Sequence, residues 1–351
     1  MAPKSREEVW KSNPSEWHDK YHGVGDFCKR AKVYYCRSGR WANFDWLLAN
    51  CDAPLSTEAM DNAATNGLYN NVVWFHEHRF EGCTTAAMDG AATHGHLKTV
   101  QYLHENRNEG CTTAAMDGAA TNNHLATVVW LHQNRSEGCT TAAMDGAATN
   151  EHLEMVKWLN ENRTEGCTTA AMDGAVNNSH ALVARWLKEN RSEGCSTAAM
   201  DNAAGQGYLA AVKWVNENFA VGCTPVAMVN AASKGYLEIV KYLVNEVNQV
   251  STNAAISVAA ENGHLEVVKY LHKLRTESCT AEAILLAKKN GHSDIVKFLL
   301  QHEECRVAYE MEKSKTRVGS ISTIAGRLLS YLAQVFDGEL TYEQENKAKS
   351  I

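Results

Sequence analysis

Cysteine and histidine, which often ligate zinc, recur along this chain on a register of 28 residues. The cysteines on this register are Cys83, Cys111, Cys139, Cys167, Cys195, Cys223 and Cys279. The histidines are His96, His124, His152, His180, His264 and His292. A metal holds its ligands at about 2 Å, whereas equivalent atoms of stacked helical repeats lie roughly 8–10 Å apart. The chain also lacks a CxxC pair, so we expect no metal site. We interpret the cysteines as reduced, buried packing residues and the histidines as caps of a helix.

A third ladder on the same register is made of aspartates, which are the candidate partner-binding residues. They are Asp61, Asp89, Asp117, Asp145, Asp173 and Asp201. One interpretation is structural: each carboxylate bonds a loop N–H or hydroxyl of a neighbouring repeat, or pairs with an arginine. The arginines on the register are Arg79, Arg107, Arg135, Arg163 and Arg191. The other interpretation is an acidic stripe that receives a basic partner. The ladder stops after Asp201, where Val229, Ser257 and Leu285 follow.

An aromatic residue also recurs once per period, and a row of aromatic side chains can bind nucleic acid by stacking on its bases. The positions are Trp74, Tyr102, Trp130, Trp158, Trp186, Trp214, Tyr242, Tyr270 and Phe298. No basic groove accompanies them, so a packed spine is the favoured interpretation. A Gly-rich phosphate loop and a GxSxG motif are both absent from the sequence. We therefore expect a protein that is not an enzyme and needs no cofactor.

Charge and composition narrow the class of partner. The chain has 351 residues, 44% of them hydrophobic, and a formal net charge of −7. Residues 1–54 hold nine Lys/Arg and seven Asp/Glu, so this segment is +2 and the remainder is −9. A mildly acidic body argues against a nucleic-acid partner. The sequence shows neither a signal peptide nor an apolar run of 18 residues, so we expect a soluble, cytoplasmic monomer that spans no membrane and leave the nucleus open.

The period itself predicts a stack of helix pairs. Nine units begin at Leu55, Cys83, Cys111, Cys139, Cys167, Cys195, Cys223, Ser251 and Cys279. In the unit 83–110, Thr84 is the expected N-cap of a helix that runs to about Thr93. Gly95 ends that helix in the left-handed conformation, and a second helix follows over about residues 97–105. Two helices this short cannot bury their apolar faces alone, so they must pack on neighbouring pairs.

Two sets of glycine positions carry structural predictions. Gly90, Gly118, Gly146 and Gly174 lie inside the first helix, where glycine costs roughly 1 kcal/mol relative to alanine. Close approach of a neighbouring helix would explain them, and so would a flat floor that admits a partner's backbone. At the turn, Gly95 gives way to Asn123, Glu151 and Ser179 in the next three units. We expect looser turns at Glu151 and Ser179, because these side chains fit the left-handed conformation poorly.

Units such as AASKGYLEIVKYLVN (231–245) and AAENGHLEVVKYLHK (259–273) resemble ankyrin repeats. The resemblance covers about 250 residues over nine units, and more weakly a tenth. An ankyrin unit usually has 33 residues, whereas this one has 28, and the missing five fall where ankyrins carry a β-hairpin finger. The Thr-Pro-Leu-His start is also absent, and only Pro225 suggests a proline at a helix start. The resemblance implies an all-α, ankyrin-like solenoid of paired short helices with reduced or absent β-hairpin fingers.

This pattern divides the chain into an N-terminal cap (1–26), a degenerate first repeat (27–54), nine ankyrin-like repeats (55–306), a C-terminal capping helix region (307–336) and a polar tail (337–351). In the segment 320–336, Ile321, Ile324, Leu328, Leu332 and Val335 recur at helical spacing. The implied function is a non-catalytic scaffold that binds a protein or peptide on an extended surface. Two alternatives stay open: an adaptor that recruits a client to a separate enzyme through residues 1–54, which contain Trp10, Trp17 and Trp41, and a purely structural spacer.

Overall fold

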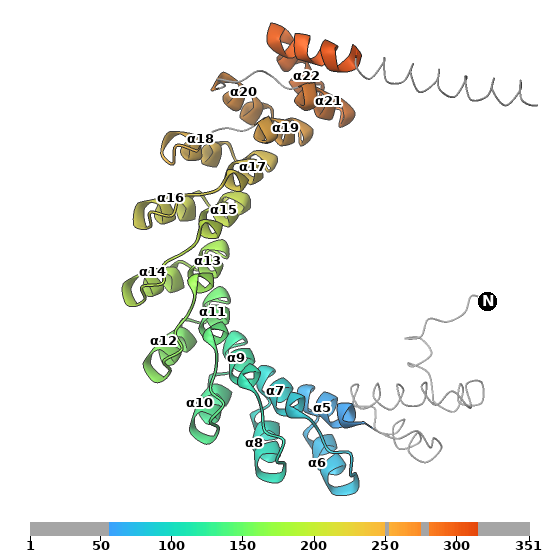
Figure 1. Ribbon diagram of the computed structural model, residues 1–351, viewed down its shortest axis with the longest axis vertical. Coiled ribbons are helices and arrows are strands. Elements are labelled where there is room, and N and C mark those ends of the chain that lie inside the picture. Colours follow the sequence, from blue (N-terminus) through green and yellow to red (C-terminus); the bar gives the residue numbers. More distant parts are fainter. Residues whose placement is uncertain (1–55, 250–252, 275–280, 315–351) are drawn as a thin grey trace, which may run out of the picture. The chain divides into compact units, whose positions relative to one another are not determined.

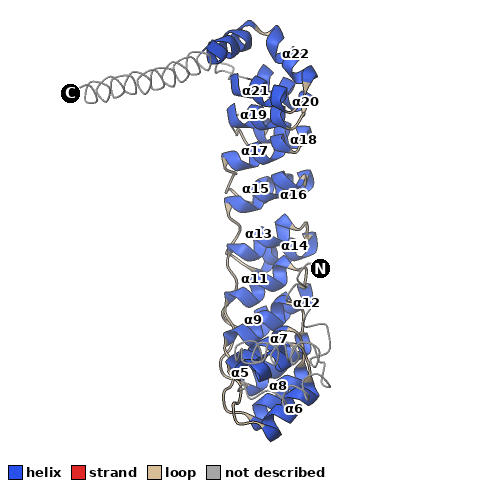
Figure 2. Ribbon diagram, turned by 90° about the vertical axis from the view of Figure 1, so that its right-hand side faces the viewer, coloured by secondary structure: helices blue, strands red, loops and turns tan. Residues whose placement is uncertain are grey.

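The computed structural model describes residues 56–249, 253–274 and 281–314. Within these ranges every regular element is a helix, and the helices follow one another in pairs at 28-residue spacing (Figures 1 and 2). The loop between two pairs is short and contains no strand among the described residues, as in 107–112. The described part of the chain is thus an all-α, ankyrin-like array without β-hairpin fingers, as the resemblance implies.

The array divides into two compact units. The N-terminal unit comprises the described residues up to Met200 together with Glu217–Val221, and the C-terminal unit comprises Asp201–Asn216 and the described residues from Gly222 onward. The first helices of the N-terminal pairs are α5 (Thr57–Thr65), α7 (Thr85–Thr93), α9 (Thr113–Thr121), α11 (Thr141–Thr149) and α13 (Thr169–Asn177). The second helices are α6 (Tyr69–His78), α8 (Leu97–Asn106), α10 (Leu125–Asn134), α12 (Leu153–Asn162) and α14 (Ala181–Asn190).

Helices α15 (Thr197–Gln206) and α16 (Leu209–Asn218) contain residues of both units. The C-terminal unit continues with α17 (Pro225–Ser233), α18 (Leu237–Asn245), α19 (Asn253–Glu261), α20 (Leu265–Lys273), α21 (Ala281–Lys289) and α22 (Ser293–Gln301). A further helix occupies 303–314. The predicted boundary between residues 306 and 307 falls inside it. The division of the chain into caps and repeats remains a proposal, and residues 1–55 and 315–351 lie outside the described part.

The sequence of one unit explains both of its helices. In α7 the hydroxyl of the N-cap Thr84 accepts a hydrogen bond from the backbone N–H of Ala86 (3.1 Å), which satisfies one of the free donors of the first turn. Ala87, Met88, Ala91 and Ala92 share one face and are buried. Helix α8 buries Thr99, Val100 and Leu103. These helix bounds agree with those expected from the sequence to within one residue.

Consecutive first helices pack closely because the mid-helix glycines allow it. A Cβ atom on Gly90 would collide with the side chain of Thr65 at the end of α5. The same relation joins Gly118 to Thr93, Gly146 to Thr121 and Gly174 to Thr149. Close approach of the neighbouring helix therefore explains these glycines.

The turn between the two helices of a repeat has one residue in the left-handed backbone conformation, whether or not that residue is glycine. Gly95 has φ +73°, and Glu151 and Ser179 have φ +65° and +62°. The expected loosening does not occur at Ser179, whose turn retains the hydrogen bond from His180 N to Ala175 O at 2.8 Å. At Glu151 the bond from Glu151 N to Ala148 O lengthens to 3.4 Å, but that from His152 N to Ala147 O stays at 2.9 Å. The prediction of a looser turn was therefore wrong at Ser179, whereas at Glu151 one of the two hydrogen bonds of the turn is longer and the other is kept.

Candidate functional site

Each aspartate of the ladder binds the first residues of the next repeat. Asp89 in α7 accepts hydrogen bonds from the backbone N–H of Thr112 (2.7 Å, Oδ1) and from its hydroxyl (2.8 Å, Oδ2). The oxygen of that hydroxyl also accepts from Ala114 N and so caps α9. The same arrangement pairs Asp61 with Thr84, Asp117 with Thr140, Asp145 with Thr168, Asp173 with Ser196 and Asp201 with Thr224. We call these six interactions the Asp–Thr clips, with serine in one of them.

The clips confirm the first structural interpretation of the aspartates. Both oxygens of each carboxylate are engaged within the array, and Asp201 is only 8% exposed. Burial also raises the pKa of the Asp61 carboxyl above its ordinary value, against the hydrogen bonds from Thr84, which lower it. The role of these six residues in binding a partner is untested and stays a prediction.

The arginine ladder pairs with glutamates and not with the aspartates, so the arginine alternative was wrong. Arg163 forms an ion pair and hydrogen bonds with Glu165, two residues further along. The pairs Arg79–Glu81, Arg107–Glu109, Arg135–Glu137 and Arg191–Glu193 repeat it. The hydrogen bonds from Arg163 lower the pKa of Glu165 to about 2.

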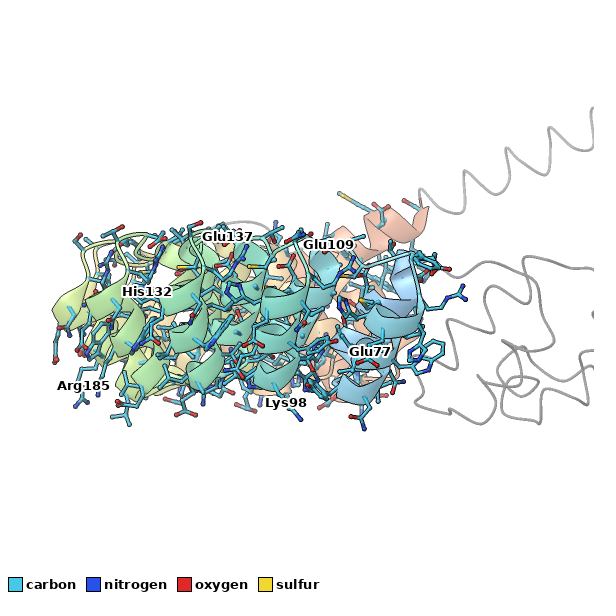
Figure 3. All side chains as sticks on the ribbon, turned by 90° about the horizontal axis from the view of Figure 1, so that it is seen from below. Glu77, Lys98, Glu109, His132, Glu137 and Arg185 are labelled. Carbon is cyan, nitrogen blue, oxygen red and sulfur yellow. The ribbon has the colours of Figure 1, made fainter. Side chains whose placement is uncertain are left out.

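The same pairs tie one repeat to the one before it. The backbone N–H of Cys83 donates to Glu109 (3.4 Å). Arg135 Nη1 lies 3.3 Å from Nδ1 of His104 in the preceding pair. A guanidinium only donates, so this contact is a hydrogen bond when that ring nitrogen is the acceptor. Glu109 and Glu137 lie along the same edge of the N-terminal unit (Figure 3), so these pairs form a second polar seam beside the clips.

The histidine ladder does not cap the helices that it precedes. His96 occupies the N-cap position of α8, but its side chain makes no capping hydrogen bond. The same holds for His124 at the N-cap of α10 and for His264 at the N-cap of α20. The rings instead lie against the left-handed residue of the preceding turn, as His96 does at Gly67. In the C-terminal unit, Nε2 of His264 donates to the carbonyl oxygen of Ser233 at 3.0 Å. The capping prediction was wrong because the ring reaches across to the previous repeat.

This position between repeats alters the titration of three rings. Burial lowers the pKa of His96, His124 and His152 below the ordinary histidine value. For His96 the neighbouring His94 adds to the lowering, while a hydrogen bond to the Thr65 backbone opposes it. The array therefore favours the neutral form of these rings.

The aromatic ladder packs between second helices, in agreement with a spine. The ring of His104 in α8 meets Trp130 in α10 edge to face, with centroids 5.2 Å apart, and His132 meets Trp158 in the same way at 5.4 Å. Both tryptophans are half-buried. Edge-to-face contacts between aromatic rings stabilise such stacks.

The cysteines on the register are packing residues wherever they are described. Cys83, Cys111, Cys139, Cys167, Cys195 and Cys223 are free thiols, and all but Cys223 are buried. Burial raises the pKa of Cys83 to about 12 and those of the other five to about 11, so little reactive thiolate forms at neutral pH. Cys279 lies outside the described residues. The expectation of reduced cysteines is therefore met by the six described members of the ladder. Cys305, in helix 303–314, is not on the ladder and is disulfide-bonded.

Metal binding and membrane insertion are two further roles that described residues could serve. Within 56–249, 253–274 and 281–314, histidine, cysteine and acidic side chains nowhere gather in a group of three suited to a metal ion. None of the described helices is both long and apolar enough to cross a membrane. The N-terminal segment with its three tryptophans, considered as a dock for a second protein, lies outside the described residues.

The C-terminal unit exposes apolar side chains that we did not select from the sequence. Val226 on α17 is 52% exposed and occupies the position of alanines such as Ala86. Val229 on α17 takes the place of the clip aspartate, and Val258 on α19 takes the place of the mid-helix glycine; both are half-buried. Aligning the repeats would have found this surface, because the residue type changes at three register positions that are nearly constant upstream.

This geometry defines a class, the helical-repeat solenoid, in which each short helix pair packs on its neighbours. Residues 175–278 and 256–317 match the family model described as ankyrin repeats (3 copies). Residues 175–317 are therefore similar to ankyrin repeats, and the helix pairs before residue 175 have the same two-helix form and the same 28-residue spacing. No curated protein matches the sequence.

Proposed function

We propose that this chain is a non-catalytic scaffold that binds a protein or peptide partner through its repeat array. Ankyrin repeats generally mediate protein–protein interaction, which supports this class of function. The observation that carries the proposal is the change to apolar side chains on the first helices of the C-terminal unit, where Val226 is exposed and Val229 and Val258 are half-buried. Apolar side chains exposed together on a folded protein mark interaction sites, and the centre of a protein interface is depleted of charge.

The proposed contact surface consists of Val226, Val229 and Val258 on α17 and α19. At the equivalent positions the upstream repeats have alanine, aspartate and glycine, which offer less apolar area or are engaged in stacking. A partner that meets the valines would bury apolar surface worth about 25 cal/mol per Å². The C-terminal unit is also where repeats differ most, so contacts there can be specific to one partner.

The aspartate ladder is a second proposed contact surface for the same function. Its carboxylates are half-exposed in the first five clips, so their charge reaches solvent although their oxygens are bonded. A row of such charges would attract a basic partner over about 10 Å at moderate ionic strength. Substitution by asparagine removes the charge and keeps an acceptor for the Thr N–H.

The test is affinity capture with the full chain as bait, followed by identification of the retained proteins. One bait carries Val226→Asp with Val229→Asp, and its matched control carries Leu182→Asp, because Leu182 is an exposed apolar residue (65%) on the second helix α14. A further bait carries Asp89→Asn, Asp117→Asn, Asp145→Asn and Asp173→Asn. Each must first show unchanged circular dichroism and melting.

Proteins retained by the wild-type and Leu182→Asp baits but lost from the valine variant would support the valine surface. Loss from the asparagine variant alone would place the contact on the aspartate ladder. Retention by every bait would favour docking through residues 1–54. If nothing is retained above blank resin, the chain is a spacer and the proposal fails.

A further inference from the structure

The last described helix forms an apolar groove with the last described repeat. Helix 303–314 and α21 form the two sides of an open groove of about 690 Å³. Leu285 and Leu286 line it from α21, and Ala308 and Met311 line it from helix 303–314. Leu285 is 42% exposed and Met311 is 61% exposed. Side chains of this size are expected to be covered when they lie together in a groove.

We propose that residues 320–336 of the same chain occupy this groove and close the C-terminal end of the array. Their apolar residues recur at intervals of three and four, so a helix would present them on one face. That face is an apolar stripe of the kind that fits a hydrophobic groove between helices. The inference is independent of the proposed partner surface, which uses α17 and α19.

Chain connectivity favours this occupant over a free partner. Residues 315–319 separate the last described residue, Ser314, from the segment, and five residues reach at most about 17 Å. Helix–helix turns of two to five residues are common, and Gly319 immediately before the segment suits such a reversal. A short tether gives an effective concentration in the millimolar range, which a separate chain would have to exceed.

The charges of the two surfaces are complementary. Residues 315–336 contain three basic residues, Lys315, Arg317 and Arg327, and no acidic residue. The groove is lined by two carboxylates, Glu282 and Glu312. Opposite charges at the rim would favour this pairing and fix its direction.

A photo-crosslinking amino acid placed at Met311 in the full chain tests the proposal, with the crosslinked peptide identified by mass spectrometry. We expect a crosslink to residues 320–336 whose yield does not change with protein concentration. Leu328→Asp should lower that yield about tenfold, because it places a charge on the buried stripe. The matched control Ser330→Asp adds the same charge on the opposite face of the segment and should leave the yield unchanged.

Three results would overturn the proposal. The first is a crosslink that joins isotopically distinct chains, which would make a second copy the occupant. The second is crosslinking that avoids residues 320–336. The third is an equal loss of yield in the Leu328→Asp and Ser330→Asp variants. Circular dichroism of each variant, measured in parallel, establishes that the array is folded.

Discussion

The N-terminal and C-terminal units build the same helix pair with different side chains. In the N-terminal unit the stacking contacts are polar and nearly identical from repeat to repeat: the Asp–Thr clips, the Arg–Glu pairs and the glycine that admits a threonine. Among the described residues of the C-terminal unit, Asp201 alone keeps a clip, and Val229, Ser257 and Leu285 follow at its register position. The arginine position holds Val247 in one repeat and Arg275 in the next, and the mid-helix glycine positions hold Asn230, Val258 and Leu286.

The difference shows that the repeated residues of the N-terminal unit serve stacking. A polar clip requires a fixed geometry, so each copy must keep both partners. The C-terminal repeats stack without most of these partners, and several of their register positions carry apolar side chains instead. The ankyrin family model matches from residue 175 onward, where most of the polar clips have ended. We infer that stacking contacts determine the repeated residues of the N-terminal unit, whereas the C-terminal unit tolerates different residues at the same register positions.

The largest expected effect comes from filling a glycine of the N-terminal unit. Gly118→Val should cost about 3 kcal/mol of local stability, because the added atoms collide with Thr93 of the preceding helix. Val258→Ala, at the same register position in the C-terminal unit, should cost about 1 kcal/mol. Native-state hydrogen exchange of α9 and α19 measures both values. Adding Thr93→Ala to Gly118→Val should recover at least half of the loss, and an absence of recovery would refute the steric account.

Removing a clip carboxylate should have the next largest effect. Asp117→Ala removes two hydrogen bonds to Thr140 and should reduce the opening free energy of α11 by about 2 kcal/mol. Val229→Ala at the same register position should cost no more than about 1 kcal/mol, because Val229 is half-buried and its side chain makes no hydrogen bond to the next repeat. Hydrogen exchange of the two helices compares them. Equal losses would mean that the two units do not differ as described.

Acid should weaken the Arg–Glu pairs of the N-terminal unit. The folded pKa of Glu165 is about 2, below its ordinary value of 4.5, so its stabilisation is complete above pH 4.5 and is lost as the pH falls toward 2. Glu165 is partly exposed, and we expect about 1 kcal/mol from this pair. Urea unfolding at pH 7 and pH 3 checks the value. Glu165→Gln should shrink the difference between the two pH values, and an unchanged difference would count against the pair.

The smallest expected effect comes from the left-handed turns of the N-terminal unit. Ser179→Gly should stabilise the unit by about 0.5 kcal/mol, because glycine adopts the left-handed conformation without steric cost. Gly95→Ser should destabilise it, because an added Cβ would meet the ring of His124. Thermal melting of both variants is sufficient. Destabilisation by Ser179→Gly would show that the serine side chain itself holds the turn.

Local features of the fold follow from sequence where a single repeat decides them. The N-cap of Thr84, the bounds of α7 and α8 and the left-handed Gly95 depend on short-range propensities and a helix-period apolar pattern, so they were predictable. The hydrogen bond of Asp89 to the next repeat was also anticipated, because an aspartate on a strict register needs a partner on the same register.

Features that depend on long side chains crossing between repeats were not predictable in the same way. The ring of His96 turns toward Gly67 of the previous turn, and Arg107 selects Glu109 over the nearby aspartates. Both outcomes depend on the rotation between neighbouring pairs, which spacing alone does not specify. The groove at Leu285 and Met311 forms only because helix 303–314 returns against α21, and no repeat pattern encodes that return.

The central claim is that the aspartate ladder holds neighbouring repeats together. A double-mutant cycle of Asp117→Ala and Thr140→Val, read from hydrogen exchange of α11, tests it most directly. Our account predicts a favourable coupling energy of about 1 kcal/mol, since the hydroxyl that Thr140→Val removes donates to Oδ2 of Asp117, while the backbone N–H of residue 140 still donates to Oδ1. A coupling energy near zero, with the two single effects simply adding, would contradict the account, because the bond between Asp117 and Thr140 would then not stabilise the stacking of repeats.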